Sequence, residues 1–186
     1  RCVGGNPKKL NFSLGSDLYG EKKEYLSFVL SGARETSVAR AMRSITIMGR
    51  KEGEAGKLAT LFYPMMQVAD IFALDVDIAH SGTDQRKVHV IARDVAPKIG
   101  RKIPVAVHHH LILGLGKPPM WPVAGDRQEL WESLKMSKSK PESAVFIHDS
   151  PQDIERKIKQ AFCPPEDTEF NPVLDWTKHL IFPINK

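Results

Sequence analysis

The segment between residues 75 and 107 restricts the possible folds of this chain more than any other. Residues 75–80 alternate polar and apolar side chains with the period of a strand, and Ser81-Gly82 then predicts a tight turn. A helix is predicted from about Asp84 to Ala96, and the apolar run at 103–107 predicts the next strand. A strand, a helix and a second strand in this order indicate a parallel sheet, so the sequence predicts an α/β fold.

The predicted helix has apolar residues at helical spacing, which should form its buried face, and Pro97 and Gly100 should end it. These apolar residues are Val88, Ile91, Ala92 and Val95. Ligands of parallel sheets bind at the carboxyl ends of the strands, which here are residues 80–85 and 108–113. The second of these ends contains His108, His109 and His110. Adjacent side chains on an extended segment point alternately to opposite faces and cannot all converge on one ion, so no metal site is predicted.

A second apolar segment, residues 61–72, predicts a helix with Pro64 in its first turn. Tyr63, Gln67 and Asp70 lie four and three residues apart, which places them on one stripe of that helix. Because the surrounding residues are apolar, these polar groups need buried partners. They form either an internal hydrogen-bond network, which the residues alone favour, or a pocket for a small polar ligand.

The loop Lys135-Met136-Ser137-Lys138-Ser139-Lys140 gathers three lysines and two serines around one methionine. Ammonium groups on long stems can reach several phosphate oxygens, and serine hydroxyls can donate or accept hydrogen bonds. The alternative of equal weight is an ordinary solvated loop. The formal net charge of +5 gives weak support to a polyanionic partner such as a nucleotide or a nucleic acid.

The flanking segments predict further helices. Two are expected between residues 21 and 50, with a break near Ser31-Gly32, and a helix capped by Ser150 is expected to run to about residue 162 with a basic face. That face, formed by Arg156, Lys157 and Lys159, is predicted to be solvated or to contact RNA phosphate. Residues 144–147 predict a short strand, and residues 172–182 another helix. Residues 1–20 and 114–133 predict irregular segments.

The composition places few further limits on function. The two cysteines, Cys2 and Cys163, form neither a disulfide framework nor a CxxC pair, which fits a reducing, cytoplasmic setting. No apolar run approaches the length of a membrane span, so no membrane association is expected.

Four motifs occur in one order: YPMMQVAD at 63–70, SGTDQRK at 81–87, KMSKS at 135–139 and DSPQDIERKIKQAFCPP at 149–165. Together they closely resemble tyrosyl-tRNA synthetases of the archaeal and eukaryotic type, which are class I synthetases. The resemblance implies the second half of a Rossmann-like catalytic domain at 61–150. It also implies a helical connective insertion that forms a homodimer contact at 1–60, and the start of a helical anticodon-binding domain at 151–186.

The resemblance also implies roles for individual residues. Tyr63 and Gln67 would hold the amino group of L-tyrosine, and Asp70 would accept a hydrogen bond from its phenol. Gln85 would help to hold the amino acid. Gly82 and Asp84 would lie against the ATP ribose, and the loop residues from Lys135 to Ser139 would bind ATP, with Lys135 and Lys138 on the phosphates. ATP would enter with Mg²⁺, and tRNA(Tyr) would be the second substrate.

Two departures from the family pattern bear on activity. The His-Ile-Gly-His type motif of the first Rossmann half is absent from this chain, and the family more often has serine at the position of Lys138. The resemblance therefore predicts a tyrosine-tRNA ligase present as a fragment. The alternatives are a noncatalytic RNA- or nucleotide-binding module of the same fold, and the related tryptophanyl enzyme.

Overall fold

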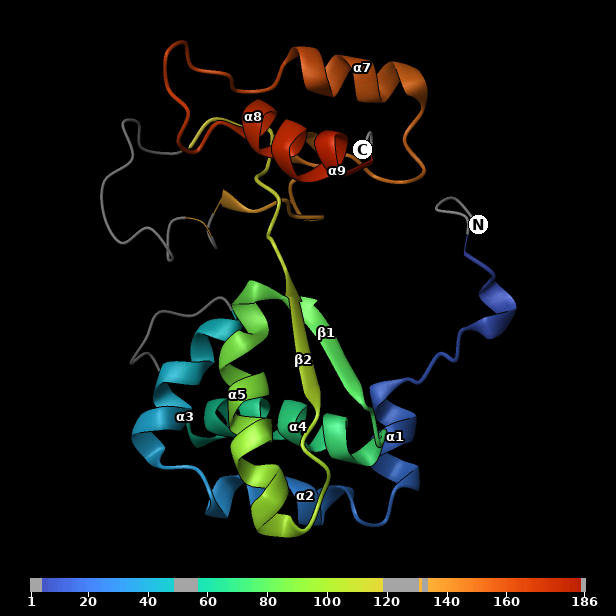
Figure 1. Ribbon diagram of the computed structural model, residues 1–186, viewed down its shortest axis with the longest axis vertical. Coiled ribbons are helices and arrows are strands. Elements are labelled where there is room, and N and C mark those ends of the chain that lie inside the picture. Colours follow the sequence, from blue (N-terminus) through green and yellow to red (C-terminus); the bar gives the residue numbers. More distant parts are fainter. Residues whose placement is uncertain (1–4, 49–56, 119–130, 132–133, 185–186) are drawn as a thin grey trace. The chain divides into compact units, whose positions relative to one another are not determined.

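The computed structural model in Figure 1 describes all residues except 1–4, 49–56, 119–130, 132–133 and 185–186. The chain divides into two compact units, Arg1–His109 and His110–Lys186. The first unit contains a two-stranded sheet with helices, and the second contains the lysine-rich loop and the C-terminal helices. Within the described ranges, none of the helices has the length and apolar character that a membrane span requires.

The first unit is mainly helical. Its elements, in chain order, are the 3₁₀ turn η1 (Pro7–Lys9), α1 (Gly15–Glu21), α2 (Tyr25–Arg34), α3 (Val38–Ser44), η2 (Ile45–Met48), α4 (Leu58–Ala73), β1 (Ile78–Gly82), η3 (Thr83–Gln85), α5 (Arg86–Val95), η4 (Ala96–Ile99) and β2 (Val105–His109).

The predicted parallel sheet is confirmed. Strands β1 and β2 pair in parallel, with a register that runs from Ile78 opposite Val105 to Gly82 opposite His109, and α5 connects them. The predicted turn at Ser81-Gly82 is wrong, because both residues belong to β1 and pair with β2. The chain turns one step later, at η3, and α5 then begins.

The core of the first unit lies between α2, α4, α5 and β1. All four residues predicted for the inner face of α5 are buried. Helix α2 continues through the predicted break at Gly32, because Gly32 is buried against α4, where a Cβ would meet Val68 at 3.6 Å. Helix α4 begins at Leu58, so Pro64 lies inside it rather than in its first turn. Helix α1 includes residues 15–20, which were predicted to be irregular, and it packs Leu18 into the core.

The second unit is built from short helices and turns. In chain order these are η5 (Pro141–Ser143), α7 (Pro151–Lys159), α8 (Pro172–Trp176), the π-helical turn η6 (Thr177–Ile181) and α9 (Phe182–Ile184). The last three confirm the helical segment predicted at 172–182.

Two secondary-structure predictions for the second unit are wrong. Residues 144–147 form no strand; instead Phe146 and Asp149 close a turn, in which each backbone N–H donates to the other residue. Helix α7 ends at Lys159, and the Phe162 N–H beyond it donates to the Leu115 carbonyl at 2.8 Å. The predicted cap is confirmed, since the Ser150 Oγ accepts from the Asp153 N–H at 3.1 Å.

The predicted basic face of α7 is wrong for Lys157, whose side chain is buried. Its Nζ donates to Asp149 Oδ2 at 2.7 Å and to the Ala144 carbonyl at 2.9 Å. Arg156 and Lys159 are exposed, as predicted, and each pairs with a glutamate, Arg156 with Glu142 and Lys159 with Glu155.

Candidate functional site

The polar stripe predicted on α4 is present, but its expected burial is wrong for Tyr63. Tyr63 is exposed, while Gln67 and Asp70 are half-buried, and the intervening Met65 and Val68 pack into the core. Because this face of α4 combines polar groups with apolar surroundings, it can offer hydrogen-bonding groups to a small ligand.

Asp70 is the most constrained member of the stripe. The Tyr25 hydroxyl of α2 donates to Asp70 Oδ1 at 2.8 Å and lies 3.2 Å from the Met66 carbonyl oxygen. Burial raises the pKa of the Asp70 carboxyl, and the hydrogen bond from Tyr25 partly offsets this shift. Burial also raises the pKa of Tyr25, and the bond to Asp70 raises it further. The Tyr25 hydroxyl is therefore held as a neutral donor to one oxygen of a half-buried carboxylate.

The carboxyl ends of the two strands lie side by side, as the register requires. Gly82 is buried at the end of β1, and Asp84 and Gln85 follow it as half-buried residues of η3. Since Gly82 pairs with His109, this edge of the sheet brings the residues after β1 next to the end of β2.

The three consecutive histidines face three different neighbours. The His108 ring lies beside the His89 ring of α5, with centroids 4.9 Å apart. His109 Nδ1 is 3.2 Å from His80 Nε2, and His110 Nε2 is 2.7 Å from an oxygen of Asp175. The alternating directions expected of adjacent extended residues account for this divergence.

The pair His89 and His108 is held mainly in the neutral form. Burial lowers the pKa of His89, and repulsion from His108 lowers it further. Burial likewise lowers the pKa of His108, with added repulsion from Arg86, His80 and His109. Each of these imidazoles is therefore harder to protonate in the folded chain than in the unfolded chain.

We expect this pair to make the chain less stable at acidic pH. The pKa values of both histidines are lowered in the folded chain. The contribution of the pair to the free energy of unfolding is therefore complete above the ordinary histidine pKa of about 6.5, and it is lost as the pH falls toward the lowered values. The substitution His89→Phe removes one imidazole with a lowered pKa. The melting temperature of this variant should therefore fall less steeply with decreasing pH than that of the unaltered chain. Thermal unfolding followed by circular dichroism measures both slopes. His148→Phe, at an exposed position, should keep the original slope; equal slopes for His89→Phe and the unaltered chain would contradict the assignment.

The base of the lysine-rich loop is anchored to the backbone of residues 112–114. Lys135 forms an antiparallel bridge with Leu113, and the Met136 N–H donates to the Ile112 carbonyl at 3.0 Å. The Gly114 N–H donates to the Leu134 carbonyl at 2.7 Å, and a Cβ on Gly114 would meet that oxygen at 3.1 Å. Glycine thus permits the close approach that holds the loop.

The tip of the loop is exposed. Ser137 Oγ and Ser139 Oγ are hydrogen-bonded at 2.8 Å, and Lys138, Ser139 and Lys140 are exposed. An anchored base and a cationic tip suit a loop that binds phosphate groups. The predicted site residues up to Gln85 lie in the first unit, and those of the loop lie in the second.

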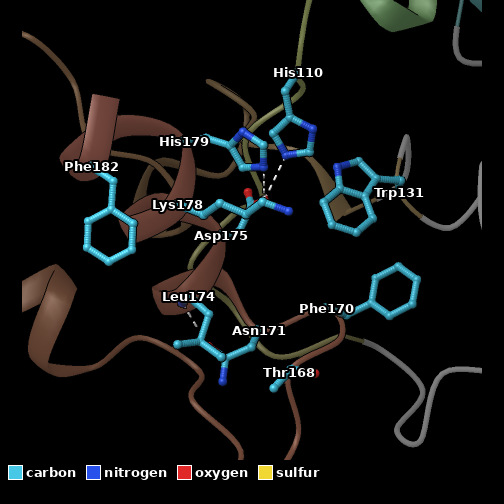
Figure 2. Close-up of a pocket in the computed structure, with 10 residues that line it drawn as sticks. All are labelled: His110, Trp131, Thr168, Phe170, Asn171, Leu174, Asp175, Lys178, His179 and Phe182. Carbon is cyan, nitrogen blue, oxygen red and sulfur yellow. Dashed lines mark hydrogen bonds and ion pairs between the residues drawn. The ribbon is translucent and has the colours of Figure 1, made fainter. Parts of the chain in front are cut away.

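Some residues of functional interest do not follow from the sequence patterns. Tyr25 lies at helical spacing with Phe28 and Val29, a pattern that indicates only core packing, although a buried tyrosine hydroxyl usually has a hydrogen-bond partner. In the second unit, His110, Asp175 and His179 meet beside a pocket (Figure 2). Their only sequence signal is the four-residue spacing of Asp175 and His179, which favours contact on a helix.

Comparison with known proteins places the chain among tRNA synthetases. The family of class I tRNA synthetases for tryptophan and tyrosine matches residues 3–181. The tyrosine–tRNA ligase of Thermococcus sibiricus is 51% identical over 98% of this chain and 51% of its own length. That of Pyrococcus abyssi is 53% identical over 97% of this chain and 51% of its own length. The chain thus spans about half the length of these curated relatives.

Solved structures agree with this placement. The crystal structure of the tyrosyl-tRNA synthetase from Pyrococcus horikoshii, complexed with L-tyrosine, matches 97% of this chain and 52% of its own with a TM-score of 0.84 and 52% identity. The synthetase from Aeropyrum pernix matches 97% of this chain and 49% of its own, with a TM-score of 0.76 and 40% identity. The α/β fold predicted from the sequence is thereby confirmed as part of the class I synthetase fold, and the chain belongs to the family of class I tRNA synthetases for tryptophan and tyrosine.

Proposed function

We propose that the protein containing this chain is a tyrosine–tRNA ligase, an enzyme that joins L-tyrosine to the 3′ end of tRNA(Tyr). The observation that carries the proposal is Asp70, a half-buried carboxylate on the polar stripe of α4 whose Oδ1 is bound by Tyr25. A carboxylate in this setting suits a phenol hydroxyl. The similarity of this chain to tyrosine–tRNA ligases, at 51% and 53% sequence identity, supports the same substrate.

The proposed tyrosine pocket uses residues of the first unit. Asp70 would accept from the tyrosine phenol through Oδ2, since Oδ1 is bound by Tyr25. Tyr63 and Gln67, on the same stripe, would bind the tyrosine amino group, with help from Gln85 in η3. An indole offers its N–H from a different position and has a larger ring, so tryptophan is the less suitable substrate for these groups.

Amino acid activation would occur at bound ATP, which enters with Mg²⁺. A tyrosine carboxylate oxygen attacks the α-phosphorus, and the bond to pyrophosphate breaks. Negative charge shifts onto the leaving phosphate oxygens, where Lys135 and Lys138 would stabilise it, while Met136, Ser137 and Ser139 shape the loop. Gly82 and Asp84 would contact the ATP ribose. In the second step a ribose hydroxyl of the tRNA attacks the adenylate carbonyl and AMP leaves.

The remaining proposed assignments concern partners and regions. Residues 1–60 would form a homodimer contact, residues 61–150 the second Rossmann half, and residues 151–186 the start of the anticodon-binding domain. We propose a cytoplasmic location, where the tRNA substrate is available. Each assignment rests on the motifs and the family membership together.

The test is tyrosine-dependent ATP–pyrophosphate exchange, assayed in the full-length product of the coding sequence that contains this chain. We expect exchange with tyrosine, and we expect Lys135→Ala to lower its rate by about tenfold or more while changing the Kd for tyrosine little, because Lys135 would act on phosphate charge. Equal losses in exchange rate and tyrosine affinity would contradict that role.

Lys140→Ala provides a matched control, because it removes the same charge from an exposed position of the same loop, outside the proposed phosphate contacts. It should retain most of the exchange rate. A full-length protein that binds ATP or RNA but shows no exchange with tyrosine would instead favour the noncatalytic module.

A further inference from the structure

A pocket of about 690 Å³ in the second unit is lined at one end by His110, Asp175 and His179 (Figure 2). The three side chains come from two parts of the chain: His110 follows β2, Asp175 lies in α8, and His179 lies in η6. None of them belongs to the tyrosine pocket or the phosphate loop proposed above.

The donor atoms of these residues converge. His110 Nε2 is 2.7 Å from Asp175 Oδ1, and His179 Nε2 is 3.7 Å from the same oxygen. One donor atom from each residue can be chosen so that all three lie within 4.8 Å of one another. In a tetrahedral zinc site with bonds of about 2.0–2.1 Å, donor atoms lie about 3.3 Å apart. Small side-chain rotations would therefore bring the three donors to ligand distances.

The surroundings hold this cluster in place. Asp175 is buried, and its second oxygen accepts from the Leu113 N–H at 3.0 Å, which fixes the plane of the carboxylate. The Trp176 indole N–H donates to the Leu113 carbonyl at 2.7 Å. Hydrogen bonds of this kind orient metal ligands in proteins. His179 lies in a π-helical turn, a local widening that often occurs at functional sites.

We propose that His110, Asp175 and His179 bind a divalent transition-metal ion, with Zn²⁺ as the best match. Two imidazole nitrogens and one carboxylate oxygen form a donor set that zinc accepts, and a water or a ligand from the pocket completes the tetrahedron. On binding, His110 keeps its proton on Nδ1 so that Nε2 faces the metal as a neutral ligand. The ion would tie the segment after β2 to the C-terminal helices.

An ordinary histidine–carboxylate pair is the competing explanation for the contact between His110 and Asp175. It accounts for the 2.7 Å distance but not for His179, whose ring stacks on that of His110 with centroids 4.0 Å apart. Both half-exposed histidines are accessible to an ion.

The test is isothermal titration of the untagged full chain with Zn²⁺ near neutral pH. We expect one saturable site per chain, with the Kd raised at least tenfold in His110→Gln and in His179→Gln. Zn²⁺ should also raise the melting temperature of the unaltered chain but not that of either variant. Circular dichroism of each variant without metal checks that it is folded. His179→Gln is the milder substitution, because His179 Nε2 lies 3.7 Å from Asp175 Oδ1, whereas His110 Nε2 lies 2.7 Å from it.

His80→Gln is the matched control, because His80 and His109 form another close histidine pair, with His109 Nδ1 3.2 Å from His80 Nε2. It should bind Zn²⁺ like the unaltered chain. The proposal is overturned by absence of saturable binding, by equal affinity in all the variants, or by loss of binding in His80→Gln alone. None of these readouts depends on aminoacylation, so failure here leaves the ligase proposal intact.

Discussion

If the full-length protein is the proposed ligase, replacing Asp70 with alanine is expected to remove most of its preference for tyrosine over phenylalanine. Phenylalanine in the proposed pocket leaves the half-buried carboxylate without the phenol partner, whereas tyrosine supplies it. An unsatisfied buried acceptor costs about 1–3 kcal/mol, and more when it is charged, so the preference should fall by about 100-fold or more in Asp70→Ala. The ratio of ATP–pyrophosphate exchange rates with the two amino acids measures it.

The changes in the exchange rates with tyrosine and with phenylalanine, taken separately, distinguish a loss of substrate recognition from a general loss of activity. Asp70→Ala should reduce exchange with tyrosine and leave exchange with phenylalanine unchanged or raised, because the penalty on the apolar ring disappears. The tyrosine preference of Asp70→Asn should lie between those of the unaltered protein and Asp70→Ala, since the amide retains an acceptor oxygen. A variant that loses both activities in proportion would show that Asp70 supports the fold and does not select the substrate.

Tyr25→Phe is the matched control for the hydrogen bond that Asp70 already makes. It removes the donor at 2.8 Å but keeps the carboxylate and the aromatic packing against Tyr19, whose ring centroid lies 4.5 Å away. If Asp70 recognises the phenol, Tyr25→Phe should retain a clear tyrosine preference. If the pair is only structural, Tyr25→Phe and Asp70→Ala should instead show the same losses.

Local patterns predicted the elements that surround these sites, because their causes lie within a few residues. The apolar spacing of α5 reports its buried face directly, and Ser150 caps α7 through the N–H of Asp153 three residues later. The end of β1 was misplaced because pairing with β2, and not local turn preference, decides whether Gly82 is in a strand. Tertiary contacts override local propensity at such boundaries.

Contacts between distant residues could not be predicted in this way. Asp70 and its hydrogen-bond partner Tyr25 are 45 residues apart in the sequence, and His110 and Asp175 are 65 residues apart. The spacing on α4 indicated that Asp70 needs a partner but not which residue supplies it. The tyrosine and phosphate residues are proposed from the motifs and the family resemblance, whereas the histidine and aspartate cluster of the second unit emerged only from the fold.

Lys157 is the clearest example of a residue whose role depends on contacts that the sequence does not predict. Its replacement should strongly destabilise the second unit. The sequence places it on a basic helix face, yet its side chain is only 5% exposed. Its Nζ binds Asp149 and the Ala144 carbonyl and lies 5.0 Å from the centre of the Phe146 ring. The bond from Lys157 is the main reason that the pKa of Asp149 is lowered. This one ammonium group therefore joins α7 to the segment that follows the lysine-rich loop.

We expect Lys157→Met to lower the melting temperature by about 10 °C, because it keeps most of the stem volume but leaves a shielded carboxylate without its cation. Lys159→Met, on the exposed side of the same helix, should lower it by about 2 °C or less, since exposed pairs such as that with Glu155 contribute little. Adding Asp149→Asn to Lys157→Met should recover part of the loss, because the unpaired charge is then removed. Thermal unfolding of the four proteins measures this pattern. Equal small shifts for the two lysine variants would mean that water replaces the buried ammonium group at little cost, and that α7 is held to this segment by its other contacts alone.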